Sequence, residues 1–211
     1  MTSNPPCEYG LDTILGVRRA IVADVYRYLT MSPENIALGD GFKRKLSAGL
    51  RPELQCLILH RVAHYLWTKR LRTPARLITC ANRLLHKAAI SPQSVIGPGA
   101  RLPHPAGVTF HGRAGRGLTI FSIGLCCTES GLPDGPLELG PHLGDDVTIG
   151  GHATIVGPVR VGSGVTIAYN CAVSAERISE LPARRLVVSG ANRARIEPAD
   201  RYEPAGEGAA A

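Results

Sequence analysis

The stretch that decides the fold runs from residue 143 to residue 173 and reads LGDDVTIGGHATIVGPVRVGSGVTIAYNCAV. An aliphatic residue occupies every sixth position of it, at Leu143, Ile149, Ile155, Val161, Ile167 and Val173. The same six-residue step precedes it, at Ile90, Ile96, Leu102, Val108, Ala114, Ile120 and Cys126. Eleven of these thirteen positions hold Ile, Leu or Val, so one repeat extends over most of residues 90–173.

A fixed six-residue period is typical of a parallel β-helix. Each hexad supplies one short strand and one turn, three hexads close a triangular coil, and the periodic residue points into it. Glycines that follow the periodic residues, such as Gly97 and Gly150, suit the tight corners. We therefore expect a mainly β protein built on a left-handed parallel β-helix of about four coils, each roughly 4.8 Å high. A β-sandwich, the alternative, would instead show period-two alternation.

The rest of the chain divides around this repeat. The segment from Cys127 to His142 interrupts it, and loops inserted in repeat arrays usually carry function. Upstream, apolar residues at helical spacing predict helices over 14–31, 54–67 and 71–87, with another beginning at Ser32-Pro33. We expect a helical domain at 1–88, the β-helix at 89–178, and a partly disordered tail at 179–211. The apolar stripe of the 54–67 helix comprises Leu54, Leu57, Ile58, Val62, Tyr65 and Leu66.

Composition narrows the class of function. The 211 residues carry a formal charge of +7 with 5% aromatics, and no aromatic-interleaved basic patch, zinc finger or helix-turn-helix pattern is present, so we expect no nucleic-acid partner. A basic balance also suits a phosphorylated small ligand. No apolar run reaches the length of a membrane span and the first ten residues lack a signal-peptide pattern, which predicts a cytoplasmic protein. The six cysteines show no metal-ligand spacing, so we expect reduced thiols and no metal.

Four stretches resemble the serine acetyltransferase family, over most of residues 50–197. HRVAHYLW at 60–67 is similar to the helix ahead of that family's β-helix, and ISPQSVIGPGA at 90–100 to its first coil. HPAGV at 104–108 resembles the stretch that begins with the catalytic histidine, and GANRARI at 190–196 the closing segment beside coenzyme A. The resemblance implies an acyltransferase that uses acetyl-CoA, with His104 as catalytic base, and a homotrimer or dimer of trimers.

The chain departs from the family pattern on the acceptor side. Pro103 stands where an aspartate commonly precedes the catalytic histidine, and Ala89 aligns with an acceptor-binding aspartate. An acidic position of the helical domain aligns near Leu38, with Asp40 close by, and the family's Arg-His pair aligns with Leu139-Gly140. The resemblance thus implies coenzyme A chemistry but leaves the acceptor open among serine, another amino acid, a sugar and a specialised metabolite.

The chemistry assigns roles to several histidines. Acyl transfer to a hydroxyl needs a base near neutral pH, and imidazole suits that role. His104 lies two residues after the repeat position Leu102, so its side chain can project outward. A backbone carbonyl, Glu129 or Asp134 of the loop, or a carboxylate of a second subunit could orient it. His142 is the second catalytic candidate, and His111 a weaker candidate for acceptor binding. We expect His152 at the surface, and His60 and His64 in helix packing.

Coenzyme A carries phosphates that Arg193 and Arg195 suit by the resemblance, since arginine makes charge-assisted hydrogen bonds to phosphate. Gly150, Gly151 and Ala168 are small enough for a pantetheine arm to approach the backbone. We therefore expect a coenzyme A-dependent O-acetyltransferase acting on a small hydroxyl compound. The alternatives are a catalytically inactive scaffold or regulatory partner, and a metal-dependent β-helix enzyme using His104, His111 and His142.

Overall fold

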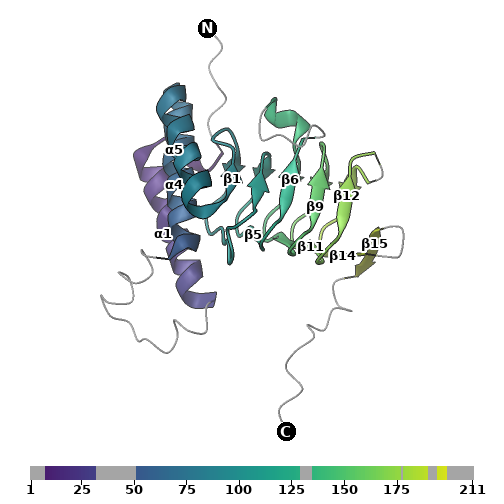
Figure 1. Ribbon diagram of the computed structural model, residues 1–211. Coiled ribbons are helices and arrows are strands. Elements are labelled where there is room, and N and C mark those ends of the chain that lie inside the picture. Colours follow the sequence, from purple (N-terminus) through teal and green to yellow (C-terminus); the bar gives the residue numbers. More distant parts are fainter. Residues whose placement is uncertain (1–7, 32–50, 129–134, 177, 190–193, 199–211) are drawn as a thin grey trace.

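The computed structural model describes residues 8–31, 51–128, 135–176, 178–189 and 194–198, with the helices gathered at one end of a β-helix (Figure 1). The helical elements are η1 (Glu8–Gly10), α1 (Ile14–Met31), α4 (Pro52–Thr68) and α5 (Arg72–His86). They confirm the helices predicted at 14–31, 54–67 and 71–87, whereas the one expected at Ser32-Pro33 lies outside the described residues. None of the helices in the described ranges is long and apolar enough to cross a membrane.

Three five-stranded sheets form the faces of the β-helix. Sheet A contains β1 (Ala89–Ile90), β3 (Thr109–Phe110), β6 (Leu125–Cys127), β9 (Thr154–Val156) and β12 (Ala172–Ser174). Sheet B contains β2 (Val95–Ile96), β4 (Arg113–Ala114), β7 (His142–Leu143), β10 (Arg160–Val161) and β13 (Glu180–Leu181). Sheet C contains β5 (Thr119–Ile120), β8 (Thr148–Ile149), β11 (Thr166–Ile167), β14 (Arg185–Ser189) and β15 (Ala194–Pro198). All pairs are parallel except β14 with β15, and repeat positions pair with each other, as Ile149 does with Ile167.

The repeat positions form the core of the β-helix. All thirteen are at most 5% exposed and belong to one continuous cluster of buried side chains. Strands of two or three residues suffice because each has a partner in the next coil and one side chain in the column. The predicted fold class is confirmed, down to which residue of each hexad points inward.

The β-helix is longer than the repeat predicted. Sheets A and B each have five strands, one for each coil, where about four coils were expected, and the last coil comprises β12, β13 and β14. It was missed because the step from Val173 to the next core residue, Leu181, is eight residues, after which Val187 restores the six. Strand pairing therefore continues past residue 178, into the segment expected to be the tail.

A buried ion pair attaches the helices to the first coil. The Arg61 side chain of α4 donates from Nε to Asp24 Oδ2 of α1 at 3.1 Å, and its other nitrogens donate to the carbonyls of Ile96 and Gly97. Asp24 Oδ1 accepts the Ala100 backbone N–H at 2.8 Å. Burial raises the pKa of Asp24, and the adjacent Arg61 guanidinium opposes that shift. We call Asp24, Arg61 and the three backbone groups the clamp.

The buried face of α4 differs from the predicted one, because it includes Arg61 of the clamp and two histidines. Its buried residues include His60, Arg61 and His64 in addition to Leu54 and Leu57, whereas Val62 of the predicted stripe is 36% exposed. His64 Nδ1 lies 3.0 Å from the carbonyl oxygen of Pro92 in the first coil. Polar side chains face the coil because its carbonyls need donors there, a requirement that apolar spacing along α4 does not reveal.

The buried histidines make stability depend on pH. Burial, with the charges of His64 and Arg61 nearby, lowers the pKa of His60 well below its usual value, and burial also lowers that of His64. As the pH falls below about 6.5, the unfolded chain takes up protons that folded His60 does not, so folding becomes less favourable. We expect the native protein to lose about 1 kcal/mol of unfolding free energy through His60 between pH 6.5 and 5.5.

Urea denaturation at several pH values measures this loss. His60→Leu keeps the site filled without a titrating group and is expected to flatten the pH dependence by that amount, whereas His152→Leu, at an exposed corner, is the matched control and should leave it unchanged. An identical pH slope in the native protein and His60→Leu would contradict the assignment.

Candidate functional site

One edge of the β-helix, where the chain passes from sheet C to sheet A, repeats the same turn in successive coils. Gly107, Ile123, His152 and Asn170 each have positive φ, from 57° to 78°. The turns are joined by hydrogen bonds: the amides of Ile123, His152 and Asn170 donate to the carbonyls of Ala106, Ser122 and Gly151, respectively. We call this stack of turns the C–A edge, and it holds most of the predicted site residues.

His104 lies on the first turn of the C–A edge, between Arg101, which bridges to β5 of sheet C, and β3 of sheet A. Its side chain is exposed, as the hexad position predicted, and Pro103 precedes it. No residue in the described ranges hydrogen-bonds to its ring, and Glu129 and Asp134 lie outside those ranges. The ring is therefore open to an incoming hydroxyl group.

The predicted coenzyme A residues share this edge. Gly150 and Gly151 follow β8, and Ala168 follows β11, which places them two and three coils from His104, or about 10 and 14 Å along the axis. A Cβ at Gly150 would lie 2.7 Å from the backbone nitrogen of Tyr169, so only glycine fits there. Gly150 and Gly151 are both buried, and a Cβ at Gly151 would lie 3.2 Å from the Tyr169 ring, so the two glycines let the coils and this ring pack closely at the edge.

Aromatic residues on this edge were missed by the sequence reasoning. The rings of Phe121 and Tyr169 are 5.8 Å apart between centroids, and Tyr169 is 55% exposed. Ile123, on the turn between His104 and these rings, is 49% exposed. They follow a repeat position by one, two and three residues, so no common offset in the hexads identifies them from the sequence. They give the edge an apolar surface.

His142 does not join His104 within one chain. It begins β7 in sheet B, with Arg113 and Arg160 as its neighbours in register, and lines a separate hollow of about 430 Å³ with Tyr9. His104 lies at the corner opposite sheet B. The second catalytic candidate is thus on another side of the same subunit from the first.

His111 is fully buried, and neither ring nitrogen has a hydrogen-bond partner among the described residues. It follows β3, and Gly140 packs so closely on its backbone that a Cβ there would meet the carbonyl oxygen of His111. His152 is exposed, as expected. His104, His111 and His142 do not converge, and no group of three metal-ligating side chains occurs in the part of the chain that the structure describes.

Of the remaining predicted positions, the structure describes Arg195 but not Arg193, Leu38 or Asp40. Arg195 lies in β15, paired with Val188 of β14, so its strand extends sheet C past Ala168. Cys56, Cys80, Cys126, Cys127 and Cys171 are free thiols, and burial raises the pKa of Cys56 to about 12.

Sequence comparison relates the chain to curated serine acetyltransferases. It is 30% identical to that of Synechococcus elongatus over 158 residues, covering 72% of this chain and 63% of the relative. It is 30% identical to that of Helicobacter pylori over 135 residues, covering 63% of this chain and 75% of the relative. Against that of Mycobacterium tuberculosis identity is 34% over 116 residues, and the chain spans only 49% of that relative. No protein-family model matches the sequence.

Solved structures show the same fold. The serine acetyltransferase of Neisseria gonorrhoeae superposes with a TM-score of 0.74 at 23% identity, covering 91% of this chain and 70% of that one. The soybean serine acetyltransferase complexed with serine gives 0.71 at 23% identity, covering 85% and 69%. A serine acetyltransferase in complex with CoA gives 0.70 at 18% identity, covering 87% and 70%. The helical domain and left-handed β-helix described above are the architecture of these proteins.

Proposed function

Because the chain belongs to the serine acetyltransferase family, we propose that it transfers an acetyl group from acetyl-CoA to a hydroxyl of a small molecule. The chain spans 63% of the Synechococcus elongatus relative and 49% of the Mycobacterium tuberculosis relative. The observation that carries the proposal is the C–A edge, on which exposed His104 and the small residues Gly150, Gly151 and Ala168 stand in line.

His104 would act as the general base. An imidazole nitrogen accepts the proton of the acceptor hydroxyl as its oxygen attacks the thioester carbonyl. The tetrahedral intermediate then collapses, the carbon–sulfur bond breaks, and the proton on the imidazolium passes to the departing thiolate. The exposed ring supports this role, since both nitrogens can reach a ligand. His142 is retained as a second catalytic candidate only for a site that a neighbouring subunit completes.

The apolar side chains and the small residues of the C–A edge would hold the thioester arm. Phe121, Ile123 and Tyr169 supply apolar surface, and Gly150, Gly151 and Ala168 let the arm lie against the backbone. Acetyl-CoA consumption, followed as thiol release with a panel of hydroxyl compounds, tests the activity. Release that depends on an acceptor supports transfer, and bound coenzyme A without any release would favour a scaffold instead.

Arg193 and Arg195 are proposed to bind coenzyme A phosphates at the far end of sheet C. We expect the double variant Arg193→Ala/Arg195→Ala to weaken coenzyme A binding by about 1.5–3 kcal/mol for each arginine–phosphate hydrogen bond that it removes. Calorimetry measures the affinity, and the unfolding midpoint, expected to change little, is the control. An unchanged affinity would remove these arginines from the site.

We also propose a cytoplasmic homotrimer or dimer of trimers. Apolar side chains of α5 support an assembly surface: Leu77, Leu84 and Leu85 are 66%, 76% and 71% exposed. An assembly would also allow a second copy to supply the group that orients His104.

A further inference from the structure

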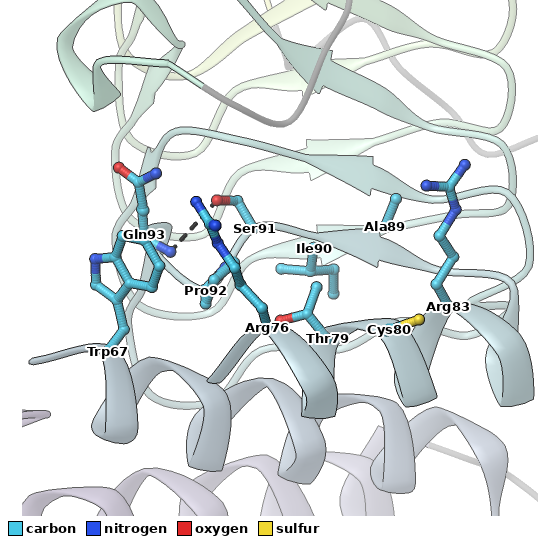
Figure 2. Close-up of a pocket in the computed structure, with 10 residues that line it drawn as sticks. All are labelled: Trp67, Arg76, Thr79, Cys80, Arg83, Ala89, Ile90, Ser91, Pro92 and Gln93. Atoms are coloured by element: carbon cyan, nitrogen blue, oxygen red, sulfur yellow. Dashed lines mark hydrogen bonds between the residues drawn. The ribbon is translucent and has the colours of Figure 1, made fainter. Parts of the chain in front are cut away.

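A cavity of about 420 Å³ lies between the helical domain and the first coil, apart from the C–A edge residues. Figure 2 shows α5 supplying one wall, with Arg76, Thr79, Cys80 and Arg83, and the strand β1 with its following turn supplying the other. Trp67 of α4 and Gln93 lie at one end, and Ala89 and Arg83 lie at the other. The volume is in the range of small-molecule sites.

The charged side chains among the described residues that line the cavity are all positive. Two guanidinium groups, of Arg76 and Arg83, line it, and none of the described residues that line it is acidic. The two are seven residues apart, two helical turns, and therefore on the same face of α5. Arg72 adds a further positive charge at the Trp67 end. The guanidinium carbons of Arg72 and Arg76 lie 5.4 and 5.9 Å from the indole centroid. Such a lining favours an anion and repels an ammonium group.

The Ala89 end of the cavity lies next to the turn that bears His104. Ala89 N donates to the carbonyl oxygen of Val108 at 2.8 Å, and Gly107 N donates to that of Lys87 at 2.9 Å. These bonds stack the first turn of the C–A edge, residues 103–107, on the start of β1. The end of the cavity that Ala89 and Arg83 line is thus beside the turn that carries His104.

We infer that this cavity binds the acceptor, and that the acceptor is a small hydroxylated anion, a carboxylate or a phosphate ester, without an ammonium group. The inference rests on the proposed acetyl transfer and names its substrate class. Ala89 and Arg83 line the end nearest the His104 turn, and none of the described lining residues is acidic, so this end offers no carboxylate to an amine. Arg83 binds the anionic group there, and Arg76 raises the local positive potential.

Binding can be measured without turnover, because Trp67 is the chain's single tryptophan and lines the cavity. Its fluorescence is titrated with glycolate, glycerol phosphate, serine, and glycolamide as the uncharged counterpart of glycolate. We expect a response to the two anions, and a dissociation constant about ten- to a hundredfold higher in Arg83→Gln. Arg19→Gln, an exposed arginine of α1 that does not line the cavity, is the matched control and should bind like the native protein.

Acetylation of the same compounds tests the acceptor assignment. We expect the kcat/KM for glycolate or glycerol phosphate to exceed that for serine, with Arg83→Gln raising KM more than it lowers kcat. The tighter of the two anions identifies the charged group. Equal responses to glycolate and glycolamide, unchanged binding in Arg83→Gln, or a preference for serine would each overturn the inference while acetyl transfer stands. Anion binding with no acceptor acetylated would instead overturn the proposed function.

Discussion

The Arg61→Met variant is expected to lose about 3–5 kcal/mol of unfolding free energy, because it leaves the Asp24 carboxylate buried without its partner. Both side chains of this ion pair are almost fully buried, at 1% and 2% exposure. The guanidinium also donates hydrogen bonds to the carbonyl oxygens of Ile96 and Gly97. Its removal therefore takes a donor from three acceptor groups, these two carbonyls and the Asp24 carboxylate. Urea denaturation at a fixed protein concentration measures the loss.

Two further variants isolate the buried charge. Arg27→Met removes a half-buried arginine of α1 that donates to the Gly99 carbonyl at 2.7 Å, and is expected to cost about 1–2 kcal/mol. Adding Asp24→Asn to Arg61→Met removes the unpaired charge but keeps an oxygen for the Ala100 N–H, and should restore part of the stability. An Arg61→Met variant no less stable than Arg27→Met would show that the clamp contributes little.

The contacts of the clamp could not be predicted from the sequence, whereas the core of the β-helix could. The six-residue period predicted thirteen core positions of the β-helix correctly, because each depends only on its own hexad. The partners of Arg61 are backbone carbonyls and a carboxylate 37 residues away along the chain, and no local pattern encodes that contact. The fifth coil was missed for a related reason: eight residues separate Val173 from Leu181, and strand pairing across the gap preserves the stack without the period.

The residues of the candidate site were also predicted only in part from the sequence. His104, Gly150, Gly151 and Ala168 were identified from motif and hexad position, and the C–A edge places them in one line. The cavity arginines were not singled out, although Arg76 and Arg83 have the two-turn spacing that puts side chains on one helix face. What makes them a pair is the first coil packed opposite α5, which only the folded arrangement provides.

If His104 is the base, His104→Ala should lower turnover about 10²- to 10⁴-fold, the usual range for removing a general base. Coenzyme A affinity should persist, because the small residues proposed to hold it lie two and three coils away on the C–A edge. His104→Asn retains a polar group that cannot accept the proton, so it should be similarly slow. Glu180→Ala, which removes an exposed titratable side chain from β13 of sheet B, away from the C–A edge, is the control and should keep the native rate.

The size of the loss in turnover of His104→Ala indicates whether another group orients the imidazole ring. Pro103 supplies no carboxylate, and the described residues supply no hydrogen bond to His104, so the imidazole is free to rotate unless Glu129, Asp134 or a second copy orients it. A loss near 10²-fold would fit a base of this kind, because a poorly held ring contributes less to start with. A loss near 10⁴-fold would require an orienting group, and dilution to a single subunit should then abolish activity if a second copy provides it. A near-native rate for His104→Ala with the true acceptor would end the assignment and leave the proton to another group on the C–A edge or across a subunit boundary.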